Sequence, residues 1–312
     1  MRRFAPVRSA LEQRLLVITG KGGVGKTTVA AAIGLLSARA GTRTIVAELG
    51  QQARLPALLQ AGAPQPGTES QLAPKLWSIS IDPDQALLEW LQSLGGRVPG
   101  RVLARSGTFQ YFAAAAPGAK ELVSMVKIWE LTRRQRTRAR HSYELVVLDA
   151  PATGHALGML ESPRTFGAIA RVGPVAAQTA SVRELLEDPA RTSYLAVAQP
   201  TEMAITETLE LADRLAGGFG RELHAVIVNG VLAQRFSAAE LDQLERASED
   251  EALARAAVLA ARAAHARARF QRNQLARLRR RRLRVVTVPF QFASELALAG
   301  VEGVAERLRG RL

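Results

Sequence analysis

One octapeptide constrains this 312-residue chain more than any other feature. Residues 20–27 read Gly-Lys-Gly-Gly-Val-Gly-Lys-Thr and match G-x-x-x-x-G-K-[ST] at every specified position. The apolar run Leu15–Thr19 precedes the motif, and a helical pattern at Thr28–Ala40, closed by Gly41, follows it. Glycines let successive N–H groups turn toward a phosphate, and a helix N-terminus adds the positive end of its dipole. The motif therefore predicts a phosphate-binding loop between a strand and a helix.

Several side chains of this loop have separate predicted roles. Lys26 would reach the β- and γ-phosphates, the Thr27 hydroxyl would bind Mg²⁺, and Thr28 would lie near the α-phosphate. Phosphate oxygens would also accept hydrogen bonds from the backbone N–H groups of Gly22, Gly23, Val24 and Gly25. The predicted ligands are ATP and Mg²⁺.

The remaining apolar runs predict the fold class. Further strands are expected at Thr44–Glu48, Leu76–Ile81, Tyr143–Leu148, Ser193–Ala198, Leu223–Val228 and Leu283–Val288. Helical patterns separate them, including one long helix at 237–280 and a terminal helix at 293–309. Residues 84–140 contain no convincing strand. We therefore expect an α/β fold, a mostly parallel twisted sheet with helices on both faces, forming one P-loop domain over 1–312 with a helical insertion at 84–140.

A carboxylate ends one of these strands. Val146-Val147-Leu148 is apolar and Asp149 follows it directly. In parallel sheets ligands bind beyond the carboxyl ends of the strands. Together with the phosphate loop, Asp149 is predicted to hold Mg²⁺ through a water.

Composition excludes several kinds of chemistry. The chain has no cysteine, so disulfides, thiolate zinc sites and a thiol arsenite site are excluded. Its net charge is +14, and 37 of its 42 basic residues are arginine, which suits anionic partners without choosing among them. No apolar run has the length of a membrane span, and the first residues lack the apolar segment of a secretory signal. The expected location is the cytoplasm.

Two segments resemble a known family. Lys21 follows the first glycine of the loop, which is the mark of the deviant Walker A ATPases. Residues 149–157, Asp-Ala-Pro-Ala-Thr-Gly-His-Ala-Leu, resemble the switch II segment of the ArsA family. That family includes the arsenite-pump ATPase and the ATPase that targets tail-anchored proteins. Less specific matches to the family at 87–91, 117–131 and 199–208 extend the resemblance over most of the chain, from Leu15 to Leu298.

The resemblance implies a function. It implies a Mg²⁺-dependent ATPase that forms a dimer, either with itself or with a related subunit. Lys21 would act on the nucleotide of the partner, Asn229 would contact adenine, and Pro289 and Phe290 would close over the base. The conformational change would act on a client that the sequence does not identify.

Switch I departs from the family pattern. The family reads approximately S-T-D-P-A-x-N there, and this chain has Ala47–Arg54, with Leu49 at the place of the aspartate. Glu48, Gln51 or Gln52 are candidates to orient the attacking water in its place. Equally, Glu48 is consistent with an ordinary residue at a strand end. We therefore expect hydrolysis to be slow or to depend on a partner subunit.

Two other functions stay open at the sequence level. One is a regulatory or scaffold subunit that binds nucleotide with little hydrolysis, suggested by the altered switch I. The other is a ParA-like ATPase that binds nucleic acid through the arginine clusters at 133–140 and 277–284. No aromatic residues alternate with those arginines, so solvated helix ends are favoured over nucleic-acid binding.

Overall fold

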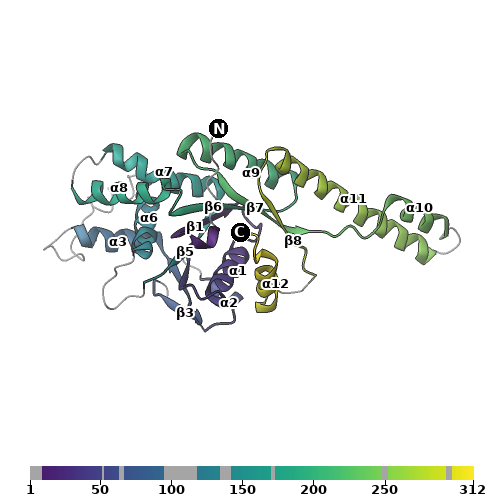
Figure 1. Cartoon of the computed structure of the whole chain (residues 1–312), viewed down its shortest axis with the longest axis horizontal. Coiled ribbons are helices and arrows are strands. Elements are labelled where there is room, and N and C mark those ends of the chain that lie inside the picture. The colour runs from purple at the N-terminus through teal and green to yellow at the C-terminus, as the bar shows by residue number, and fades with distance from the viewer. Residues whose placement is uncertain are drawn as a thin grey trace.

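The computed structural model describes residues 9–50, 53–62, 67–94, 118–133, 142–169, 173–247, 252–292 and 297–312. Within these residues one sheet of eight strands has the order β3-β4-β2-β5-β1-β6-β7-β8 (Figure 1). The strands are β1 (Leu15–Gly20), β2 (Thr44–Leu49), β3 (Ser70–Ala73), β4 (Leu76–Ile81), β5 (Leu145–Ala152), β6 (Thr192–Ala198), β7 (Leu223–Val231) and β8 (Val285–Pro289). Every neighbouring pair is parallel except β3–β4. The predicted α/β class is confirmed.

The sheet is buried because helices cover both of its faces. Every residue of β1 and β6 is buried, which explains why their sequences are continuously apolar instead of alternating. On one face lie α1 (Lys26–Arg39), the short α2 (Leu55–Leu58) and α12 (Leu298–Leu308), with α12 packed against α1. The other face carries α7 (Thr153–Ile169), α8 (Pro174–Glu187) and α9 (Glu202–Arg214). This arrangement places the carboxyl ends of β1 and β5 side by side.

A layer of helices lies at the β4–β5 crossover. It contains α3 (Pro83–Leu94) and α6 (Ala119–Thr132), and α6 packs against α3, α7 and α8. Leu122, Met125 and Val126 on α6 are buried. These side chains therefore belong to the core. The middle of the expected insertion, residues 95–117, lies outside the described residues.

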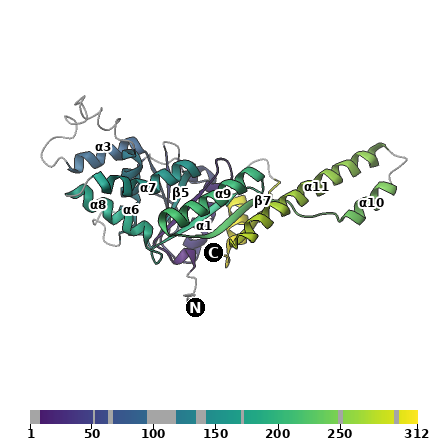
Figure 2. The same ribbon diagram turned by 90° about the horizontal axis from the view of Figure 1, so that it is seen from above.

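Two helices project from the body of the molecule as an arm (Figures 1 and 2). They are α10 (Ala238–Ala247) and α11 (Ala252–Arg280), which pack against each other. The prediction of a single helix over 237–280 is therefore wrong, since α10 and α11 are separate helices and residues 248–251 lie outside the described part. None of the described helices is both long and apolar enough to cross a membrane.

Other boundaries differ by a few residues from those expected. The antiparallel strand β3 was not expected, because Ser70–Ala73 has little apolar character and gains its order by pairing with the edge of β4. β8 begins at Val285 and α12 at Leu298. Two short turns complete the described elements, η1 (Ala10–Glu12) and the π-helical η2 (Leu215–Phe219).

Candidate nucleotide site

The loop between β1 and α1 needs glycine at two positions. A Cβ on Gly20 would lie 2.0 Å from the carbonyl oxygen of Val197, and a Cβ on Gly25 would lie 2.4 Å from Nδ2 of Asn229. Gly25 also has a φ of +95°, in the left-handed region that favours glycine, and it caps α1. The helix therefore begins at Lys26, two residues earlier than expected, and its free N–H groups face the loop.

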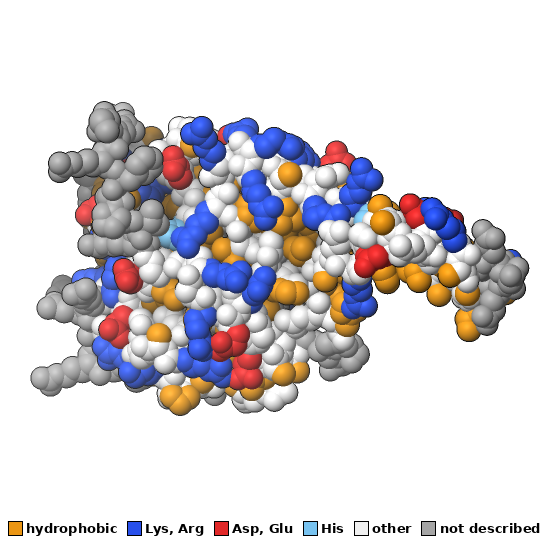
Figure 3. All heavy atoms as spheres, turned by 45° about the vertical axis from the view of Figure 1, so that its right-hand side comes forward, with side chains coloured by type: hydrophobic (Ala, Val, Ile, Leu, Met, Phe, Trp, Pro, Cys, Tyr) orange, Lys and Arg blue, Asp and Glu red, His pale blue; other side chains and the backbone are white. Residues whose placement is uncertain are grey.

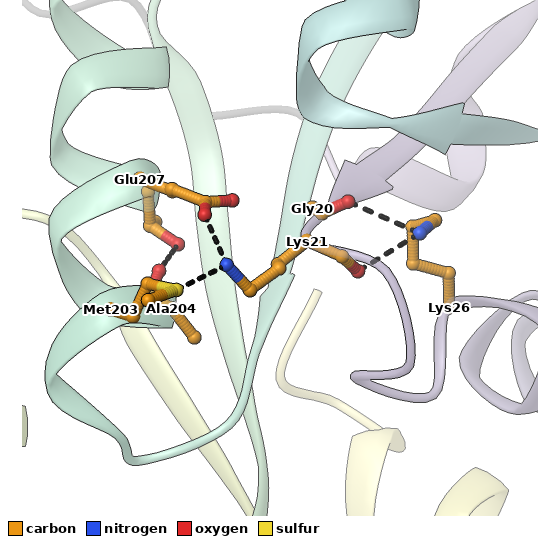
Figure 4. Close-up of polar contacts among 7 residues, drawn as sticks. Gly20, Lys21, Lys26, Met203, Ala204 and Glu207 are labelled. Carbon is orange, nitrogen blue, oxygen red and sulfur yellow. Dashed lines mark hydrogen bonds and ion pairs between the residues drawn. The ribbon is translucent and has the colours of Figure 1, made fainter.

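Lys26 is held inside this turn. Its Nζ donates to the carbonyl oxygens of Gly20 at 3.1 Å and Lys21 at 3.0 Å (Figure 4). Burial lowers the pKa of Lys26, and the nearby carboxylate of Asp149 opposes that shift. The ammonium group is therefore positioned where the motif predicts a phosphate contact.

Thr27 and Asp149 meet at the carboxyl ends of β1 and β5. The Thr27 hydroxyl donates to Oδ2 of Asp149 at 2.6 Å, while Oδ1 of Asp149 is buried and accepts no hydrogen bond within the described residues. Burial raises the pKa of Asp149, and the Thr27 hydrogen bond and the charges of Lys26 and Arg54 oppose that rise. A hydroxyl and a carboxylate are the oxygen donors that Mg²⁺ prefers, and a buried oxygen without a partner fits a hydrated cation. These residues therefore fit the predicted metal.

Glu48 lies beside Asp149 in the sheet, since the two residues are in register between β2 and β5. Its carboxylate accepts from the backbone N–H groups of Arg54 at 3.0 Å and Leu55 at 3.2 Å, at the start of α2. The side chain is only 4% exposed, and burial raises its pKa against those two hydrogen bonds. Both oxygens thus serve the turn that leads from β2 into α2. Gln51 and Gln52, the other candidates for positioning water, lie outside the described residues.

Lys21 bonds to its own chain. Its Nζ pairs with Oε1 of Glu207 and contacts Sδ of Met203 at 2.6 Å, both on α9 (Figure 4). Lys21 and Glu207 are each about one third exposed. The sequence does not predict these partners, because they lie more than 180 residues from Lys21 along the chain and belong to no motif.

A second group of predicted residues lies beside the loop. Asn229 Nδ2 donates to the carbonyl oxygen of Val24 at 3.0 Å, which ties the end of β7 to the phosphate loop. At the neighbouring end of β8, Pro289 pairs with Val231, and the exposed Phe290 packs edge-to-face on Phe292 with centroids 4.9 Å apart. The predicted base-contacting residues therefore come together at one side of the loop.

The remaining predicted residues have simple placements. Gly22 and Gly23 lie in the exposed turn, Val24 is buried, and Thr28 lies in the first turn of α1. Gln199, in the turn that joins β6 to α9, donates to the carbonyl oxygen of Gly23 at 3.5 Å. This side chain is not predicted from the sequence, and neither is Arg54, whose charge adds to the lowering of the Lys26 pKa and opposes the rise of the Asp149 pKa. No motif marks either residue.

Comparisons with known proteins show the family of this chain. The family model for anion-transporting ATPases of the ArsA type matches residues 13–173 and 167–256. The chain is 30% identical over 256 residues to ATPase BagA of Mycobacterium tuberculosis, covering 80% of this chain and 74% of BagA. It is 24% identical over 268 residues to ATPase get3 of Neurospora crassa, covering 72% of this chain and 76% of that protein. The chain therefore belongs to the ArsA family, whose members are ATPases.

Proposed function

We propose that this protein is a Mg²⁺-dependent ATP hydrolase that works as a dimeric nucleotide switch. The observation that carries the proposal is the contact between Thr27 and Asp149, 2.6 Å long, at the carboxyl edge of the sheet beside the Lys26 ammonium. A Ser or Thr hydroxyl and a strand-end carboxylate are the groups that hold Mg²⁺ in P-loop enzymes.

Each residue of the loop then has one role. Lys26 and the N–H groups of the loop bind the phosphates, and Thr27 and Asp149 hold the metal. When bound, Mg²⁺ neutralises charge on the β- and γ-phosphates. Asn229, Pro289 and Phe290 contact the base. In this scheme Lys26 exchanges its bonds with the carbonyls of Gly20 and Lys21 for bonds to phosphate oxygens.

In the proposed dimer the Lys21 side chain would occupy a different position from the one described above. It would leave Glu207 and reach the nucleotide of a second subunit, which is either another copy or a related ATPase. The pair is partly exposed, so breaking it costs less than about 1 kcal/mol. Nucleotide binding can supply that much free energy many times over.

Switch I supports a second candidate function. The carboxylate of Glu48 is already engaged by two backbone N–H groups, and Leu49 occupies the place of the family's aspartate. A chain with these features would bind ATP and hydrolyse it little, as the regulatory subunit of a related ATPase. Leu49→Asp separates the two functions, because turnover rises if the missing carboxylate is limiting and stays constant if it is not.

ATP turnover by the full chain with Mg²⁺, beside Lys26→Ala, tests the proposal. Circular dichroism of both proteins controls for folding. Wild-type turnover at least about tenfold above Lys26→Ala supports hydrolysis, since the loop lysine stabilises the transferring phosphate. ATP binding without turnover above that control, alone or with a related subunit, supports the regulatory function instead.

A further inference from the structure

The arm formed by α10 and α11 has an inner and an outer side. In the first two thirds of α11 the inner residues recur every three or four positions and face α10 and the body of the molecule. They are Ala254, Val258, Ala261, His265 and Ala268. Val258 and Ala268 are buried, and His265 Nδ1 lies 2.8 Å from the carbonyl oxygen of Phe236. One face of α11 is therefore already packed within the chain.

The opposite face of α11 carries a second apolar row, which we call the outer stripe. It consists of Ala252, Ala256, Leu259, Ala263, Ala266 and Phe270. All six are exposed, with Leu259 69% and Phe270 46% exposed, and Figure 3 shows hydrophobic side chains along one side of the arm. Their spacing of four, three, four, three and four residues keeps them within about 80° of arc over about 27 Å of helix. This is the a/d spacing of a helix that packs against another helix.

The borders of the outer stripe are positively charged. The a positions are Ala256, Ala263 and Phe270. One border carries an arginine directly before each of them, at positions 255, 262 and 269, and Arg267 lies on the other border. Across its 29 residues α11 contains eight arginines and no acidic residue. The acidic groups that face Arg262 within the arm, Asp242 and Glu245, come from α10 on the inner side.

These charges decide what can cover the stripe. Two copies of α11 packed stripe to stripe would bring arginine against arginine on at least one border, in either the parallel or the antiparallel orientation. Like charges across such a seam are unfavourable, whereas acidic residues on the facing helix would pair with Arg267 and Arg269, one on each border. A second copy of this helix therefore does not fit.

We propose that the outer stripe of α11 is the docking site for an amphipathic helix of another protein, one with aliphatic residues in heptad spacing and acidic residues along its borders. Small alanines let the two backbones approach closely, and the two large side chains, Leu259 near the middle and Phe270 at one end, anchor the seam. The arm extends away from the nucleotide site, so the docked helix would recruit a partner without entering that site.

A designed peptide tests the proposal on the full chain. The probe is a fluorescent three-heptad peptide with Leu at positions a and d and Glu at e and g, measured by anisotropy. One matched peptide carries Lys at e and g, and a second keeps the Glu residues but carries Ser at a and d. Docking requires both apolar packing at a and d and acidic residues at e and g. The Glu/Leu peptide should therefore bind at least about tenfold more tightly than either control.

Two arm variants locate the site. Ala263 lies in the outer stripe and Ala264 is exposed beside it, about 100° around the helix. Ala263→Arg should weaken binding of the Glu/Leu peptide about tenfold despite the added positive charge, and Ala264→Arg should leave it unchanged or slightly tighter. Circular dichroism checks that both variants keep their helix content.

Several results would overturn the proposal. Equal effects of the two substitutions, or equal binding of the Glu/Ser peptide, would assign the attraction to the general positive charge of the protein. Self-association in light scattering that Ala263→Arg abolishes would assign the stripe to a second copy. Binding to phosphatidylserine vesicles that depends on Ala263, without binding of the Glu/Leu peptide, would assign it to a lipid surface.

Discussion

Asp149 has two oxygens in different situations, and that difference explains much of the site. Oδ2 accepts from Thr27, while Oδ1 is buried and lacks a hydrogen-bond partner in the described part of the chain. A buried carboxylate in this state is unfavourable in the ligand-free protein and is stabilised when a cation binds. The site is therefore arranged at some cost to the ligand-free fold.

Asp149→Asn tests this cost through pH dependence. Burial raises the pKa of Asp149 from its ordinary value of 3.8 and that of Glu48 from 4.5. Each of these carboxyl groups therefore favours the folded state at a pH below its ordinary pKa. That contribution is lost as the pH rises through its raised pKa in the folded protein. In chelator, the urea midpoint of the wild type should therefore fall as the pH rises above about 4, and that of Asp149→Asn should fall less. An equal fall in both proteins would contradict the assignment.

The same variant should lose activity. Without the carboxylate the hydrated metal loses a charged partner, which we expect to cost about 2.7 kcal/mol, or about 100-fold in turnover. ATP binding measured in chelator should change little, because the phosphates are held by the loop. Turnover by Asp149→Asn at the wild-type rate would remove Asp149 from the metal site.

Glu48→Gln separates a structural role from a catalytic one. Glutamine keeps one acceptor oxygen and turns an NH₂ group toward a backbone donor, so the unfolding free energy should fall by about 1–3 kcal/mol. Turnover at a temperature where the variant stays folded should change less than about tenfold. A larger loss of turnover with unchanged stability would make Glu48 the group that positions water.

The sequence predicts the residues of the site best where spacing alone fixes them. Lys26, Thr27 and Asp149 follow from a motif and a strand end, and the structure brings them together. The partners of Glu48 depend on how the chain turns after β2, and those of Lys21 on packing against α9. Such contacts arise from tertiary structure and leave no local pattern.

At the scale of elements, edge and junction features were the hardest to predict. The central strands β1, β5 and β6 are mostly apolar, and each begins within two residues of its predicted start. β3 pairs only with β4 at the edge of the sheet, and its four residues carry no strong signal. The expected helix at 237–280 is two helices, α10 and α11. The residues on both sides of the junction favour helix, so composition alone does not mark the break between them.

The contact between the phosphate loop and α9 allows a test of the proposed switch. Glu207→Gln removes the partner of Lys21, and Glu210→Gln makes the same charge change on the same helix. The pair is partly exposed, so the melting temperature should stay close to that of the wild type. Glu207→Gln should form dimers at lower concentrations of a non-hydrolysable ATP analogue with Mg²⁺, as measured by light scattering.

Glu210→Gln should behave as the wild type in that measurement. If the two variants have the same effect, the change follows from net charge. If Glu207→Gln does not shift dimer formation, the contact with α9 does not restrain Lys21.

At the scale of the whole molecule, the nucleotide site and the arm lie in different places. The site is built at the carboxyl edge of the sheet, and α10 and α11 extend from the β7–β8 end (Figure 2). Helix α6 packs against α7 and α8, and α3 packs against α6, so this part of the expected insertion at 84–140 shares a layer with helices that follow switch II.

In the proposed dimer Lys21 of one subunit completes the site of the other, and mixing two inactive variants tests this arrangement. Lys21→Ala keeps its own phosphate loop, and Lys26→Ala keeps the lysine that would act across the interface. Each variant alone should be inactive, and an equal mixture should recover about a quarter of wild-type turnover, because half of the dimers are mixed and each has one complete site. A mixture as inactive as its components, beside an active wild type, would contradict the claim.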